Sequence, residues 1–126
     1  MTTPRHMVID ALAPLLPDVD VVAYARNLDS LDRPTVMVAI HTVTPLPTPG
    51  VGFRTYTFEL YVMTPLTTPG DADDELDATL EDLLAALDDT GQLGWSDARR
   101  GTYEDAWPAY VVTVPTYSQH TPPDTP

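Results

Sequence analysis

Three histidines, His6, His41 and His120, are the residues of this 126-residue chain best suited to bind a metal or to transfer protons near neutral pH. The chain has no cysteine. Zinc sites and histidine–carboxylate dyads need short, fixed spacings such as HxH or HExxH, and none occurs. The sequence therefore predicts no metal site, and His41 is expected to be a core or interface histidine.

A run of carboxylates, DADDELD at residues 71–77, is the second group of residues that could bind a metal ion or take part in catalysis. It does not fit a calcium loop, which needs glycine at its sixth position, where this chain has Leu76. The glycine motifs of nucleophile elbows, P-loops and dinucleotide sites are absent, and no carboxylate stands isolated in an apolar setting as acid–base catalysis requires. The sequence predicts no catalytic residue, no cofactor and no enzyme.

The charge balance disfavours a role in gripping nucleic acid. Nineteen carboxylates face six arginines and no lysine, which gives a net charge of −13. A phosphate-binding surface needs a basic patch, and the arginines are scattered along the chain. A group of aromatic residues late in the sequence suits a core lid or a subunit contact, with a ligand pocket as the alternative. This group comprises Trp95, Tyr103, Trp107 and Tyr110.

Hydrophobic periodicity predicts seven elements that must position these residues. A helix begins at Thr3-Pro4 and ends or kinks at Pro14. The strands are expected at 19–25, 35–43, 53–63, 93–100 and 109–117. In the second strand, alternation places Met37, Ala39, His41 and Val43 on one face.

The most regular element is a second helix at residues 71–90. Its leucines recur at i, i+4, i+7, i+8 and i+11, and its first turn is acidic, as the helix dipole favours. The predicted core leucines are Leu76, Leu80, Leu83, Leu84 and Leu87. The predicted fold is α+β, a mostly antiparallel sheet of about five strands with two helices on one face, in the order α-β-β-β-α-β-β. Residues 1–117 form the single domain and 118–126 a flexible tail.

The heptapeptide TPLPTPG at 44–50 recurs almost unchanged as TPLTTPG at 64–70. Prolines end a sheet ladder, and proline-glycine marks a turn, so both copies are expected to terminate strands. The first copy leads into another strand and predicts a hairpin loop, whereas the second leads into a helix and predicts a crossover. Eleven residues at 53–63 would span roughly 36 Å, which predicts a hairpin that projects beyond the body.

The chain resembles the tail terminator proteins of long-tailed, non-contractile bacteriophages. The resemblance covers about residues 5–117. It rests on the opening MVIDALAPLLPDVDVVAY, on FRTYTFELYVMTP followed by an acidic leucine helix, and on the ending YEDAWPAYVVTVPTY. No single motif is specific to the family.

This resemblance implies a virion structural protein rather than a catalyst. Such proteins form a ring, usually of six subunits, that caps the tail tube, ends its polymerisation and presents a surface to the head-side connector. The implied partners are copies of itself, the tube protein and the connector, while DNA passes through without specific binding. The implied location is the tail–neck region of the virion, and the host cytoplasm during assembly. No apolar run is long enough to span a membrane.

The hairpin tip is the predicted contact with a neighbouring subunit or with the tube, because its prolines lower the entropy lost on docking. The candidate interface residues are Arg33, Pro45, Pro47, Pro49 and Arg54. The two arginines are expected to pair with the acidic helix of the next subunit. Three alternatives stay open: another neck component such as a connector or stopper, an acidic DNA-mimic inhibitor, and a small-molecule enzyme or ligand domain built on the aromatic group.

Overall fold

The computed structural model of the chain describes residues 4–23, 32–45, 53–66, 68–90, 93–103 and 107–119. Its elements follow the order α-β-β-β-α-β-β, with a 3-10 turn after the first helix, and this confirms the predicted α+β fold class. The helices are α1 (Pro4–Leu12), η1 (Ala13–Leu15, 3-10) and α2 (Pro69–Thr90), and the strands are β1 (Asp20–Val22), β2 (Thr35–Pro45), β3 (Phe53–Met63), β4 (Asp97–Tyr103) and β5 (Trp107–Gln119).

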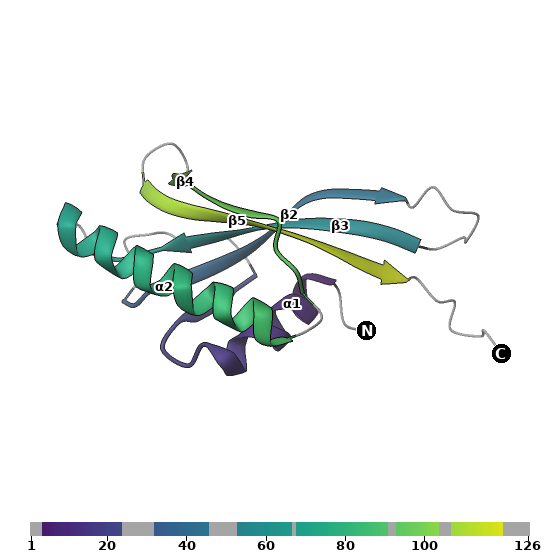
Figure 1. The fold of residues 1–126 in the computed structure, drawn as a ribbon, viewed down its shortest axis with the longest axis horizontal. Coiled ribbons are helices and arrows are strands. Elements are labelled where there is room, and N and C mark those ends of the chain that lie inside the picture. The colour runs from purple at the N-terminus through teal and green to yellow at the C-terminus, as the bar shows by residue number, and fades with distance from the viewer. Residues whose placement is uncertain are drawn as a thin grey trace.

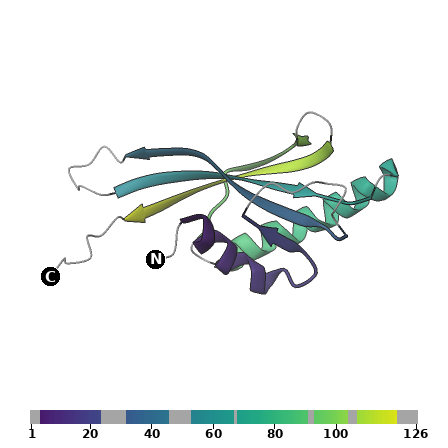
Figure 2. The same ribbon diagram turned by 180° about the vertical axis from the view of Figure 1, so that it is seen from behind.

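The five strands form one sheet in the order β1-β2-β3-β5-β4. The β1 strand runs parallel to β2, and all other neighbours are antiparallel. Both helices lie on the same side of this sheet, as Figure 1 and the reverse view in Figure 2 show. The first heptapeptide begins with the last two residues of β2, Thr44 and Pro45, and its remainder lies outside the described residues. The second precedes and enters α2, which carries the chain to the far edge of the sheet.

The core lies between the two helices and the covered face of the sheet. The stripe on α2 is buried at Leu76, Leu83 and Leu87, which are fully inaccessible, whereas Leu80 and Leu84 are half-buried against it. The sheet contributes the alternate residues of its central strands. They are Val36, Val38, Phe58, Leu60, Val62, Val112 and Val114, and α1 adds Val8 and Leu12.

Polar contacts fix α2 at the β4–β5 end of the sheet. Arg100 Nη2 donates to Asp73 Oδ1 at 2.6 Å, and Tyr110 Oη donates to Asp77 Oδ1 at 2.6 Å. The Arg100 guanidinium also lies 5.3 Å from the centre of the Tyr110 ring, within cation–π range. Part of the acidic face of α2 therefore holds the helix on its own sheet.

The last two strands differ in length from the sequence prediction. The β4 strand runs from Asp97 through Gly101 to Tyr103, where the sequence predicted a turn beginning at residue 101. The reason is tertiary, because Gly101 pairs with Ala109 and Tyr103 with Trp107 in the β4–β5 ladder. The β5 strand reaches Gln119, past the predicted domain boundary at residue 117.

Replacing Leu83 by Asp is expected to unfold the domain. The side chain is fully buried, and an unpaired buried carboxylate costs several kcal/mol, against a total stability of about 5–15 kcal/mol. Circular dichroism during urea or thermal denaturation measures the loss. The control is Ala78→Asp, at an exposed position on the same helix. Cooperative unfolding of Leu83→Asp with the wild-type midpoint would contradict the assigned core.

Replacing Tyr110 by Phe is expected to change how stability depends on alkaline pH. The hydrogen bond to Asp77, with a contribution from burial, raises the pKa of Tyr110 above its usual value. The folded state thus holds this proton more tightly, so its contribution is complete below about pH 10 and is lost as pH rises through the raised pKa. Urea denaturation from about pH 8 to about pH 11 should show a shallower alkaline decline in Tyr110→Phe. Tyr56→Phe is the control, and equal slopes for all three proteins would refute the assignment.

Candidate functional site: a sheet arm and an acidic groove

Three strands continue past the two helices and form a projecting arm. We define the arm as residues 40–45 of β2, 53–58 of β3 and 114–119 of β5, which pair side by side from Ile40, Phe58 and Val114 to Pro45, Arg54 and Ser118. Figures 1 and 2 both show these strand ends extending beyond α1 and α2. The sequence predicted a two-stranded projecting hairpin. The third strand arises because β5 is 13 residues long.

A β-bulge at His41 separates the arm from the body of β2. Ile40 pairs with Phe58 and Thr42 with Thr57, so His41 is an extra residue opposite the junction. The predicted alternation, which put Val43 on the same face as Met37 and Ala39, is therefore wrong. The inserted residue shifts the pattern by one position, and Val43, opposite Tyr56, joins the helix-side face.

The helix-side face of the arm is apolar, and it becomes partly exposed beyond Phe58 and Val114, which are still fully buried. Ile40 is 38% exposed and Val43 is 47% exposed, although both are large aliphatic residues on a strand. Beside them, the Tyr56 ring stacks on Phe58 with centroids 6.2 Å apart. The helices that bury this face in the body of the sheet do not reach the outer end of the arm (Figure 1). An apolar strand face in this position is typical of a protein contact.

The opposite face of the sheet carries a charge network centred on Glu59, beside a small apolar cluster of Met37, Met63 and Ala109. Arg99 Nη2 donates to Glu59 Oε2 at 2.7 Å, and the Glu59 hydrogen bond raises the pKa of Arg99. His41 Nδ1 lies 3.4 Å from Glu59 Oε1, and Tyr61 Oη donates to the same oxygen at 3.3 Å. In the arm this face bears Thr42, Thr44, Thr55 and Thr57. The two faces of the arm thus differ sharply in polarity.

The free edge of β5 in the arm is blocked by a proline. The amide of Ser96 donates to the Thr113 carbonyl at 2.9 Å, so the backbone groups of Thr113 point toward β4. Alternate residues of a strand point to the same side, which places the Pro115 nitrogen on that side too. The β4 strand stops pairing at Thr113. The Pro115 nitrogen, which carries no hydrogen, therefore lies on the outer edge of β5. An added strand would need a hydrogen-bond donor at this position.

The free edge of β2 is blocked in the same way. The Pro34 carbonyl accepts a hydrogen bond from the Asp20 amide at 2.9 Å, so even-numbered residues before the bulge point outward, toward β1. Because His41 is an extra residue, the odd-numbered residues after the bulge are the ones whose backbone groups point outward, and Pro45 is one of them. The β1 strand pairs with β2 only as far as Met37. Each exposed edge of the arm therefore carries a proline that disfavours strand addition.

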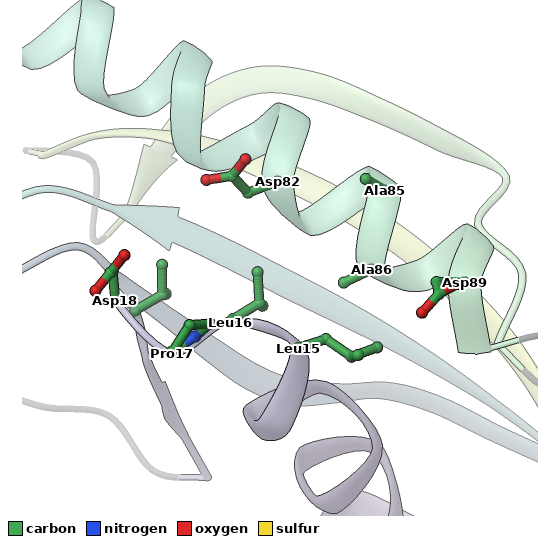
Figure 3. A pocket seen from close by; sticks show the side chains of 9 residues that line it. Leu15, Leu16, Pro17, Asp18, Asp82, Ala85, Ala86 and Asp89 are labelled. Atoms are coloured by element: carbon green, nitrogen blue, oxygen red, sulfur yellow. The ribbon is translucent and has the colours of Figure 1, made fainter.

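A groove of about 400 Å³ lies between α2 and the segment that follows α1. Figure 3 shows Asp82, Ala86 and Asp89 of α2 above residues 15–18, with Asp18 at one end. Its apolar lining includes Leu15, which is 40% exposed. In the described parts of the chain, the lining consists of Leu15, Leu16, Pro17, Asp18, Val19, Asp82, Ala85, Ala86 and Asp89, none of which is a cation.

The structure separates the candidate interface residues into two places. Arg33 lies before β2, at the base of the hairpin, where its Nη2 contacts Asp20 Oδ1 at 2.6 Å and its Nη1 donates to the Pro17 carbonyl. The hydrogen bond to Asp20 raises the pKa of Arg33. Arg54 and Pro45 pair at the other end of the eleven-residue strands, where the structure describes their backbone. Pro47 and Pro49 lie outside the described residues.

Among the aromatic residues whose side chains the structure describes, neither Trp95 nor Tyr110 lines the groove. Trp95 donates from Nε1 to Asp88 Oδ1 at 3.2 Å, whereas Tyr110 binds Asp77 on the covered face. Tyr103 and Trp107 are register partners at the end of the β4–β5 ladder. Among the described residues, no three metal-ligating side chains gather at one point. No helix in the described part of the chain is long and apolar enough to cross a membrane.

No protein-family model matches the chain, and no curated protein matches it. Among solved structures, the chain is similar to the sheath/tube terminator, in the extended state, of PVC, an extracellular contractile injection system. The identity is 14% and the TM-score 0.44, over 100% of this chain and 62% of that one, so this chain spans less than two thirds of its neighbour. That neighbour is part of a contractile assembly, and the non-contractile type of tail implied by the sequence resemblance stays a prediction.

Replacing Pro115 by Val is expected to leave the monomer folded and to make it self-associate through strand edges. The change restores an outward N–H on the free edge of β5 and adds a residue favourable to strands. Light scattering and thioflavin T fluorescence over time measure the association. Pro65→Thr, outside the sheet, is the matched control. A Pro115→Val protein that stays as monodisperse as this control would contradict the role given to the proline.

Proposed function

We propose that this chain is a structural subunit that caps a tail tube as a ring, ends tube polymerisation and offers a surface for joining to a head-side connector. The observation that carries the proposal is the arm, whose apolar face is exposed and whose edges are blocked. The sequence resemblance to tail terminators supplies the biological setting. This role needs no catalysis, and the His41–Glu59 contact lies on a strand surface rather than in a cleft.

A ring is supported by the presence of two unlike surfaces on one chain. A closed ring of identical subunits uses a head-to-tail contact, in which one patch of each subunit meets a different patch of the next. The arm projects and exposes Ile40 and Val43 on one face, whereas the groove is concave and lined in part by Asp18, Asp82 and Asp89. A single self-complementary patch would instead favour a two-fold dimer.

The charge distribution is compatible with DNA passing through such a ring without being held. The described ion pairs engage Arg33, Arg99 and Arg100 with carboxylates of their own chain. Phosphate binding depends on cations that can replace counterions, and a body of net charge −13 offers few. A lumen built from this chain would repel the DNA backbone and so permit sliding.

Replacing residues 44–50 by a short Gly-Ser turn is expected to leave the monomer folded and to impair assembly. The core lies in the body of the sheet, whereas this segment closes the arm. Circular dichroism tests folding. Size-exclusion chromatography with light scattering and negative-stain imaging, alone and with the cognate tube protein, test ring formation. Ala78→Ser, on the exposed side of α2, is the control.

The same assays separate the alternatives. Tails of normal length that join heads in the presence of the loop variant would refute the role of the arm. A wild-type protein that stays monomeric and never associates with tube ends would refute the capping role itself. Binding to an isolated connector without the tube would point to another neck component, and capture of a nucleic-acid enzyme would point to a DNA mimic.

A further inference from the structure

We propose that His41 is a pH-sensitive link that fixes the arm to the body of the sheet. Protonated His41 binds Glu59 as an ion pair beside the β-bulge and holds the arm in its described orientation. Loss of that proton weakens the contact and loosens the root of the arm. This inference rests on the capping function proposed above, because it concerns the regulation of the surface that carries that function.

The bulge is the junction between the arm and the body. His41 is the extra residue where the register of β2 on β3 shifts between Ile40 and Thr42. A bulge interrupts the hydrogen-bond ladder locally and bends the strand that contains it. The β1 strand pairs with β2 only as far as Met37, so β3 is the one described strand that pairs with β2 at the bulge. The direction of the arm therefore depends on what holds residue 41.

The carboxylate that faces His41 is already ordered by other contacts. The Glu59 side chain is 14% exposed, and its Oε2 accepts from Arg99 Nη2 of β4 at 2.7 Å. Its other oxygen, Oε1, accepts from Tyr61 and lies 3.4 Å from His41 Nδ1. Pairing therefore costs the side-chain entropy of the imidazole, while the carboxylate has little left to lose.

His41 is the group of this network whose charge changes near neutral pH. On this face of the sheet, the described ionisable groups around it are Glu59 and Tyr61 of β3 and Asp97 and Arg99 of β4. The helices lie on the other face (Figures 1 and 2), and β5 contributes the hydroxyl of Thr113. Imidazole is the side-chain group that ordinarily gains its charge between about pH 8 and about pH 5.

The direction of the effect follows from the charge on the imidazole. A hydrogen bond from a cation to a carboxylate is roughly twice as strong as one between neutral groups. The contact with Glu59 is therefore strongest on the acidic side of the histidine range and weakens as the pH rises through it. The arm is expected to be better ordered at the lower pH.

Assembly would multiply this effect. The His41 side chain is 56% exposed, and an ion pair of that kind is a small term within one subunit. In a closed ring the same contact recurs in every subunit, and each arm must be in place for the ring to close. A small change in the order of each arm thus becomes a larger change in the yield of rings.

Amide hydrogen exchange of the free subunit tests the link directly. It is measured at about pH 5.5 and about pH 8 and expressed as protection factors, so that the intrinsic dependence of exchange on pH cancels. The variants are His41→Gln, which removes the charge, and His41→Arg, which keeps it at both pH values. The control is His6→Gln, at an exposed position on α1.

Wild-type protein is expected to lose protection about two- to fivefold in the arm on going to the higher pH. The amides concerned are those of residues 42–44 and 55–57, whereas residues 58–63 and 109–113 in the body should not change. His6→Gln should behave like wild type. His41→Gln should have the lower arm protection at both pH values, and His41→Arg the higher.

Ring formation with the tube protein at the same two pH values tests the regulatory role. Wild-type rings should form more readily at the lower pH, and by a larger factor than rings of His41→Arg. The comparison with this variant removes the general effect of acid on a chain of net charge −13. Equal pH dependence of the two proteins would overturn the regulatory role.

Three results of the exchange measurement would overturn the link itself. They are wild-type arm protection that does not depend on pH, an unchanged pH dependence in His41→Gln, and a loss of protection that the arm and the body share equally. Failure of wild-type protein to assemble at either pH would instead refute the capping function. The two ideas are distinguished because exchange is measured on the free subunit, whereas capping needs the tube.

Discussion

The packing of the α2 stripe against the central strands is the interaction on which the rest of this structure depends. The helix buries residues from Ala72 to Leu87, and these cover the sheet only as far as the level of Phe58 and Val114. At about 3.3 Å per residue, β5 extends roughly 43 Å, longer than the roughly 33 Å of the 22-residue helix. The strands continue to alternate apolar and polar residues beyond the point where the helices end. Their apolar residues there are left exposed.

The exposed strand edges of the arm could promote aggregation, and the positions of two prolines oppose it. Exposed strand edges recruit further strands and lead to aggregation. Pro45 and Pro115 stand at outward-facing positions of the two edges, where they cost no hydrogen bond within the sheet and deny one to an incoming strand. Moving either proline by one residue would remove a ladder bond to β3 instead. The bulge at His41 is part of this arrangement, because it turns both Val43 and Pro45 to their present sides.

The sequence was sufficient for the fold class and the order of elements, because these depend on local periodicity and proline positions. The α2 stripe and the alternation in β3 are strong signals of that kind. The face of Val43 was assigned wrongly, since a bulge has no reliable signature in a single sequence. The third strand of the arm and the extension of β4 to Tyr103 were missed because both depend on pairing between distant segments. The groove combines residues 15–19 with 82–89, which are distant in the sequence, so no local sequence pattern predicts it.

The net charge of −13 imposes a condition on any assembly of this chain. Repulsion between whole subunits acts over the Debye length, about 8 Å at physiological ionic strength, whereas burial of apolar surface stabilises an interface only at contact. Free subunits are therefore held apart, and the attractive term operates once something else has brought them together. The end of a tube would do this by binding several copies side by side, which raises their effective concentration. In the proposed capping role, the acidity of the chain would keep free subunits apart and so confine their association to the tube end, where they are concentrated side by side.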